Sequence, residues 1–69
     1  MLIEIVINGE RRSMPEQSTV HNLLEELGVA NRQGTAVAVN MEVVPRQAHA
    51  VTVLRAGDRV EIVQAVGGG

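Results

Sequence analysis

The feature that most constrains the fold of this chain is a β-branched segment, residues 2–7 (LIEIVI), followed at once by Asn8-Gly9. Isoleucine and valine around a single charged residue are typical of a strand in a half-buried sheet. Asn-Gly favours positive φ at both central positions of a two-residue turn, so the chain is predicted to reverse there into a hairpin. Residues 10–14 are the predicted returning strand, which Pro15 ends because proline cannot donate to a ladder.

A single amphipathic helix is predicted after the hairpin. Its apolar stripe consists of four residues at helical spacing: Val20, Leu23, Leu24 and Leu27. Ser18 or Thr19 is the predicted N-cap, and Gly28 stands where a left-handed C-terminal residue is expected. A helix of about two to three turns is not stable alone, so it must lay this stripe on a sheet.

The remainder of the chain adds further β segments. The predicted strands are residues 36–40, 43–44 and 59–66. Residues 46–50 read as irregular or as one helical turn, and residues 51–54 are apolar but ambiguous. This order predicts an α+β fold in which a mixed sheet of four to five strands packs on one helix. The small size suggests the ubiquitin-like β-grasp, with the first and last strands side by side in the sheet centre.

Composition excludes several classes of function. Cysteine, lysine and aromatic residues are absent, which excludes disulfides, thiolate chemistry and the stacking of bases on aromatic side chains. The net charge is −2 and the charged residues are scattered along the chain, so nucleic acid is not an expected partner. No apolar run approaches the roughly 18 residues of a membrane span, and no signal-peptide pattern is present. We therefore expect a soluble cytoplasmic protein with no membrane partner.

No side chain suggests catalysis by this chain. His21 and His49 are its two histidines, and neither has a serine or an acid at a spacing that indicates a triad. His21 is placed to pair with Glu25 at i, i+4, and His49 is interpreted as a loop residue. Asp58 follows Gly57 in a turn, which is a common use of aspartate. We expect no catalytic residue, no metal site and no permanently bound cofactor.

Side-chain alternation predicts an apolar patch on the sheet face away from the helix. Glu4 and Glu61 mark the solvent side of the first and last strands. The residues predicted to face the helix are Ile3, Ile5, Ile7, Val60, Ile62 and Val66. Those predicted on the outer face are Leu2, Val6, Val63 and Ala65, joined by Ala36 and Ala38. We expect this contiguous patch, with Val66 at the base of the tail, to bind a partner, although scattered aliphatics are also ordinary on small domains.

The last three residues, Gly67, Gly68 and Gly69, are predicted to form a flexible tail after a domain of residues 1–66. Glycine has no Cβ and tolerates almost any φ/ψ, so such a thread fits a narrow channel. It would bring the carboxylate of Gly69 to a buried ATP site in a partner, where adenylation makes the carboxylate an electrophile. The alternative is an inert, poorly ordered terminus.

Nearly the whole chain resembles the ThiS family of sulfur carrier proteins of thiamin biosynthesis. The resemblance is carried by the opening strand with Asn8-Gly9 and by residues 20–29 (VHNLLEELGV), 36–46 (AVAVNMEVVPR) and 57–69 (GDRVEIVQAVGGG). Its most specific mark is Val39-Asn40 followed by Val44-Pro45-Arg46. One departure is visible, because such proteins often carry a tryptophan after this motif and the stretch here reads Gln47-Ala48-His49.

The resemblance implies a β-grasp carrier that other enzymes act on. Gly69 would be adenylated with ATP by a ThiF-type enzyme and converted to a thiocarboxylate by a cysteine desulfurase route, with Gly67 and Gly68 as the thread. Thiazole synthase (ThiG) would accept the sulfur, and the outer apolar face would dock the activating enzyme. The alternatives are a MoaD-like carrier for molybdopterin synthesis, a carrier for tRNA thiolation or cysteine synthesis, and a binding module with an inert tail. Val44-Pro45-Arg46 and the short length favour ThiS.

Overall fold

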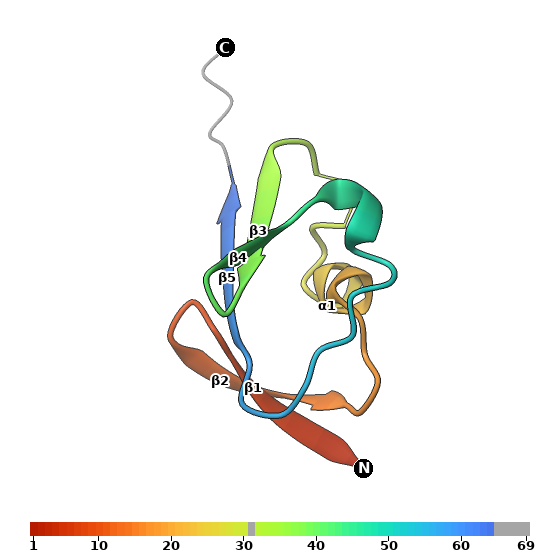
Figure 1. The fold of residues 1–69 in the computed structure, drawn as a ribbon, viewed down its shortest axis with the longest axis vertical. Coiled ribbons are helices and arrows are strands. Elements are labelled where there is room, and N and C mark those ends of the chain that lie inside the picture. The colour runs from red at the N-terminus through yellow and green to blue at the C-terminus, as the bar shows by residue number, and fades with distance from the viewer. Residues whose placement is uncertain (31, 65–69) are drawn as a thin grey trace.

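The computed structural model describes residues 1–30 and 32–64 of the chain. In chain order the elements are β1 (Leu2–Ile7), β2 (Glu10–Pro15), α1 (Val20–Glu26), β3 (Thr35–Val39), β4 (Glu42–Val44), the 3₁₀ turn η1 (Arg46–Ala48) and β5 (Arg59–Gln64). The five strands form one sheet in the order β2-β1-β5-β3-β4, and α1 lies against one of its faces (Figure 1). β1 and β5 are parallel neighbours, while the other pairs are antiparallel. The predicted α+β arrangement is therefore confirmed, with the first and last strands adjacent in the centre.

Both hairpins turn on an asparagine in the left-handed region. Asn8 has a φ of +49° and Gly9 one of +86°, as the Asn-Gly signal predicts. Asn40 and Met41, with φ values of +51° and +70°, make the equivalent turn between β3 and β4. Asn40 thus belongs to the turn and not to the strand before it.

The helix carries its predicted caps at both ends. Thr19 is the N-cap: its hydroxyl accepts the N–H of Asn22, and the Asn22 side chain accepts the N–H of Thr19 in return. At the other end, Gly28 takes a φ of +77°, and the N–H of Val29 donates back to the carbonyl of Leu24 at 2.9 Å. This is a Schellman-type C-terminus, which satisfies a carbonyl that the helix leaves unpaired.

The core lies between α1 and the sheet. Its buried residues are Ile5, Ile7, Met14, Val20, Leu23, Leu24, Val37, Leu54 and Val60. Ile3 and Ile62 pack against them while staying partly exposed, in line with the predicted alternation. Leu27 departs from the prediction, because the helix ends at Glu26 and leaves this side chain 36% exposed at the edge of the core.

The segment that the sequence leaves ambiguous, residues 51–54, closes the N-terminal end of the helix. Thr52 accepts the N–H of Val20 at 3.0 Å, and Leu54 donates its own N–H to the carbonyl of Ser18 at 2.8 Å. Leu54 is 2% exposed and belongs to the core. The segment therefore satisfies a helix N–H group that has no partner inside the helix.

His49 lies in the turn after η1, as expected of a loop residue, but its side chain is buried. It follows η1, and its Nε2 lies 3.1 Å from the carbonyl oxygen of Val44. Its own carbonyl accepts the N–H of His21 at 2.9 Å. His49 thus joins the end of β4 to the start of α1 in a structural role.

Candidate functional site

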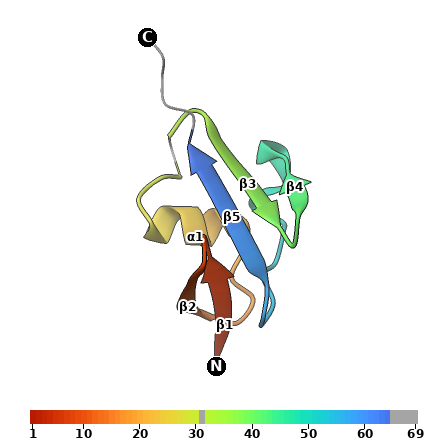
Figure 2. The same cartoon turned by 90° about the vertical axis from the view of Figure 1, so that its left-hand side faces the viewer.

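The predicted site is the C-terminal tail, and the structure describes the strand that leads into it. Gly67, Gly68 and Gly69, together with Ala65 and Val66, lie outside the described residues. β5 runs up the centre of the sheet between β1 and β3 and ends at Gln64 (Figures 1 and 2). The geometry of the site is therefore the geometry around residues 62–64.

On the β1 side, a side chain continues the sheet where the strand has ended. β1 stops at Ile7, and the next residue, Asn8, is already in the turn. Asn8 Oδ1 accepts the N–H of Ile62 at 2.9 Å, and Asn8 Nδ2 donates to the carbonyl of Ile62 at 3.2 Å. The carboxamide offers the acceptor and donor that one more strand residue would have offered, so Ile62 remains paired on this side.

On the β3 side, β5 is paired along its length. The register runs from Val39 opposite Val60 to Thr35 opposite Gln64. Just before β3, Arg32 Nη1 donates to the side-chain oxygen of Gln64 at 3.0 Å. The base of the tail is thus held by both neighbours at Ile62, and by β3 and Arg32 at Gln64.

Figure 2 turns toward the reader the outer face of the sheet, which is the face away from α1. This face carries an apolar patch near the end of β5. Val63 is 62% exposed and lies opposite Ala36. Val43 is 77% exposed and lies opposite Ala38, which in turn neighbours Glu61. We call Ala36, Ala38, Val43 and Val63 the tail-end patch. Val43 is not among the residues predicted for this face, although side-chain alternation counted from the turn at Asn40 would have placed it there.

Leu2 and Val6 lie on the outer face but do not extend this patch, which corrects the predicted contiguous surface. The parallel register places Val6 opposite Arg59. Leu2 is four positions before Val6, and Val63 is four positions after Arg59, so the two are separated by roughly 26 Å along the strands. Leu2 is exposed, whereas Val6 is half-buried between Arg11 and Arg59. Alternation predicted the face correctly, but the stagger of β1 against β5 divides it.

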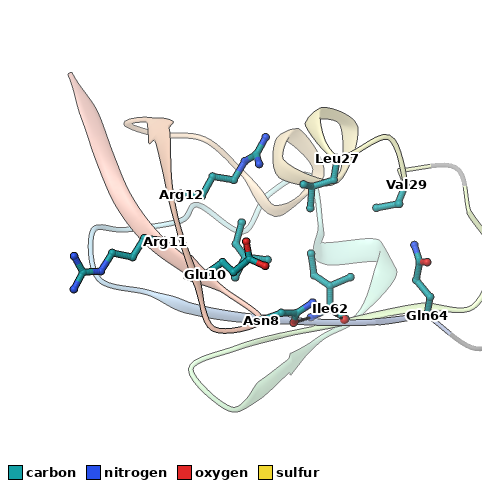
Figure 3. Close-up of a pocket in the computed structure, with 9 residues that line it drawn as sticks. Asn8, Glu10, Arg11, Arg12, Leu27, Val29, Ile62 and Gln64 are labelled. Atoms are coloured by element: carbon teal, nitrogen blue, oxygen red, sulfur yellow. Dashed lines mark hydrogen bonds between the residues drawn. The ribbon is translucent and has the colours of Figure 1, made fainter.

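A groove of about 390 Å³ opens on the helix side of the same strand end (Figure 3). Ile7, Leu27, Val29 and Ile62 provide its apolar lining, and the hairpin tip closes one side. Arg12 lies in its wall with Nη2 2.9 Å from Glu26 Oε1, whereas Arg11 points away from the groove (Figure 3). Among the described residues that line it, Glu10 is the one carboxylate and none is a histidine, so they do not resemble a catalytic constellation.

Among residues 1–30 and 32–64, no three His, Asp or Glu side chains gather as a metal site would require. His21 Nε2 and Glu25 Oε1 lie 3.5 Å apart on the exposed side of the helix, as their spacing predicts. In the same described residues, no helix has the length and apolarity that a membrane span needs.

Comparison with known families and sequences gives a consistent result. The ThiS family model matches residues 4–69. The Escherichia coli sulfur carrier protein ThiS is 33% identical over 67 residues, which cover 97% of this chain and the whole of that protein. A thiazole synthase of Paramagnetospirillum magneticum is 45% identical over 67 residues, and this chain spans only 20% of its length.

Solved structures of similar proteins share the fold. The crystal structure of a thiamine biosynthesis protein (ThiS) from Geobacter metallireducens matches with a TM-score of 0.81 at 33% identity, over 97% of this chain and all of that one. A solution structure of a thiamine biosynthesis protein from the same organism matches with a TM-score of 0.75 at 32% identity, over 97% and 88% of the two chains. These matches confirm the resemblance found in the sequence. The chain therefore belongs to the ThiS family of sulfur carrier proteins.

Proposed function

We propose that this chain donates sulfur for thiazole formation in thiamin biosynthesis from a thiocarboxylate formed at Gly69. One observation carries the proposal: the central strand β5, fastened to both neighbours near its end, leads directly into Ala-Val-Gly-Gly-Gly in a chain of the ThiS family. The described residues anchor this strand, and among them no three His, Asp or Glu side chains gather as a metal site would require. In this proposal partner enzymes carry out the chemistry, and the chain is the carrier on which they act.

The proposed chemistry has two stages, and its atoms balance. A carboxylate oxygen of Gly69 attacks the α-phosphorus of ATP, which releases pyrophosphate and leaves an acyl-adenylate. A persulfide sulfur then attacks the acyl carbon, and AMP leaves with one of the original carboxylate oxygens. A thiol reductant cleaves the resulting acyl disulfide, so the net change replaces one carboxylate oxygen with sulfur. ATP is a substrate of the activating partner and not a resident cofactor of this chain.

The proposed partners are a ThiF-type adenylating enzyme, a cysteine desulfurase route and a thiazole synthase (ThiG), all in the cytoplasm. The tail-end patch is the proposed dock of the activating enzyme, because it adjoins the strand from which the tail continues. Ala65 and Val66 adjoin this patch in sequence and stay in the proposed interface. The thiazole synthase that contains a stretch 45% identical to this chain supports that enzyme as the sulfur acceptor.

ATP–pyrophosphate exchange with a ThiF-type enzyme tests the first stage. We expect exchange with the intact chain and none after deletion of Gly69 or addition of one alanine behind it, since either change moves the carboxylate. An alanine added before Met1 serves as the control and should leave exchange unchanged. Normal exchange with the C-terminally extended variant would contradict the proposal.

A further inference from the structure

We propose that Asn8 is a positioning residue for the reactive tail. Its carboxamide holds the backbone of Ile62, two residues before the end of β5, and so holds in place the end of the strand that precedes the tail in sequence. The inference rests on the proposed function, because it gives the anchoring a purpose in presenting the tail to the activating enzyme.

The two hydrogen bonds are separable from the role of Asn8 in the turn. A residue at position 8 needs to tolerate a φ of +49°, and both asparagine and glycine do so. Glycine would satisfy the turn fully but would have no side chain for Ile62. The contact between residues 54 positions apart therefore adds something that the hairpin alone does not require.

The contact lies in the half of β5 that leads into the tail. Backbone bonds between β1 and β5 secure the first half of the strand, where the N–H of Val6 donates to the Asp58 carbonyl and that of Asn8 to the Val60 carbonyl, both at 2.9 Å. The side chain of Asn8 carries the same ladder one step further, to Ile62. Without it, the end of β5 would be held from the β3 side alone, and docking would have to order it at an entropic cost.

Asn40 provides a matched control within the same chain. It too has a left-handed φ in a hairpin turn, and its Oδ1 accepts a backbone N–H of β5 at 3.0 Å. That N–H belongs to Arg59, at the start of the strand and away from the tail. Asn40 Nδ2 also donates to Asp58 Oδ1 at 3.0 Å, so Asn40→Gly and Asn8→Gly each remove two side-chain hydrogen bonds, at opposite ends of one strand.

The experiment compares both variants in amide hydrogen exchange and in ATP–pyrophosphate exchange with the activating enzyme. In Asn8→Gly we expect the amide hydrogen of Ile62 to exchange at least about tenfold faster than in the wild type. In Asn40→Gly we expect the same acceleration at the amide of Arg59. The KM for the carrier should rise about five- to tenfold in Asn8→Gly with kcat unchanged. Docking must then order the end of β5, at a cost comparable to the net hydrogen bonding that the variant has lost. In Asn40→Gly the KM should stay at the wild-type value.

Several outcomes would overturn the positioning role. An unchanged KM in Asn8→Gly would do so, as would equal KM increases in the two variants, which indicate general loosening of the fold. If Asn8→Gly does not fold, Asn8→Asp serves as the test, because aspartate still accepts the Ile62 N–H but cannot donate to the Ile62 carbonyl. A KM increase smaller than the five- to tenfold expected for Asn8→Gly supports the role. An unchanged KM refutes it. Absence of exchange with the wild-type chain would instead refute the proposed function, and the role of Asn8 with it.

Discussion

Asn8 and Ile62 are 54 positions apart in sequence, yet one carboxamide joins them through hydrogen bonds of 2.9 and 3.2 Å. The first hairpin turn and the last strand are therefore a single structural unit. Because β5 continues into the glycines, the part of the fold most readily predicted from sequence also supports the part that is proposed to react.

Replacing Asn8 with alanine separates the energetic contributions of this residue. Asn8→Ala loses both hydrogen bonds and, unlike Asn8→Gly, keeps a Cβ in the left-handed region without the polar side chain that lets asparagine tolerate it. A Cβ there costs roughly 1–2 kcal/mol relative to glycine. The free energy of unfolding should fall by about 2–3 kcal/mol, against about 1 kcal/mol for Asn8→Gly. Urea denaturation of the two variants measures the difference, and equal losses would show that the backbone conformation contributes nothing.

Substitution of Val63 tests the tail-end patch as a docking surface. Val63→Arg should raise the KM of the activating enzyme for the carrier by at least about tenfold, because docking would then bury the charged guanidinium in the interface. The free energy of unfolding should change by less than about 0.5 kcal/mol, since Val63 is 62% exposed.

Leu2→Arg is the matched control for that substitution. Leu2 is 68% exposed on the same face but lies at the far end of the sheet. The KM of the activating enzyme for the Leu2→Arg carrier should remain within about twofold of the wild-type value, as for a residue outside an interface core. Equal effects of the two arginines would mean that the interface covers the whole outer face, as alternation alone predicts.

Leu54 and Val51 test how the connection before β5 is packed. Leu54→Ala should lower the free energy of unfolding by about 2–5 kcal/mol, because it removes a buried side chain from the core. Val51 is 75% exposed, and Val51→Ala should cost less than about 0.5 kcal/mol. Similar losses in urea denaturation would contradict the observed packing of this segment.

The capping box at the start of α1 makes a further prediction. Thr19→Ala should destabilise the chain by about 1 kcal/mol, because the N–H of Asn22 loses its acceptor at the helix end. Asn22→Ala should cost somewhat less, and the double variant less than the sum, since the two bonds belong to one motif. Strict additivity in thermal or urea unfolding would show that the two bonds act independently.

Local patterns predicted the local structure well. The Asn8-Gly9 turn, the capped helix with Gly28 just after its end, and the burial of Ile5 and Val60 all follow from residues near each of them in sequence. The ThiS resemblance was also visible in the sequence. Turn chemistry, helix spacing and strand alternation are short-range properties, so a single sequence displays them.

Long-range register could not be predicted in the same way. Nothing near Leu2 indicates that β1 pairs with β5 in a stagger that separates it from Val63. The hydrogen bonds of Asn8 to Ile62 are likewise invisible locally, because the turn already accounts for the asparagine. Residues 51–54 show no periodicity, since hydrogen bonds to the end of α1, and not a strand ladder, decide their path.

Intact-mass spectrometry tests the central claim most directly. The protein is incubated with the ThiF-type enzyme, ATP, cysteine, a cysteine desulfurase and a thiol reductant, and is then fragmented to locate any change. Replacement of one carboxylate oxygen by sulfur predicts a gain of about 16 Da that maps to Gly69. An unchanged mass, or a sulfur found on any other residue, would contradict the account.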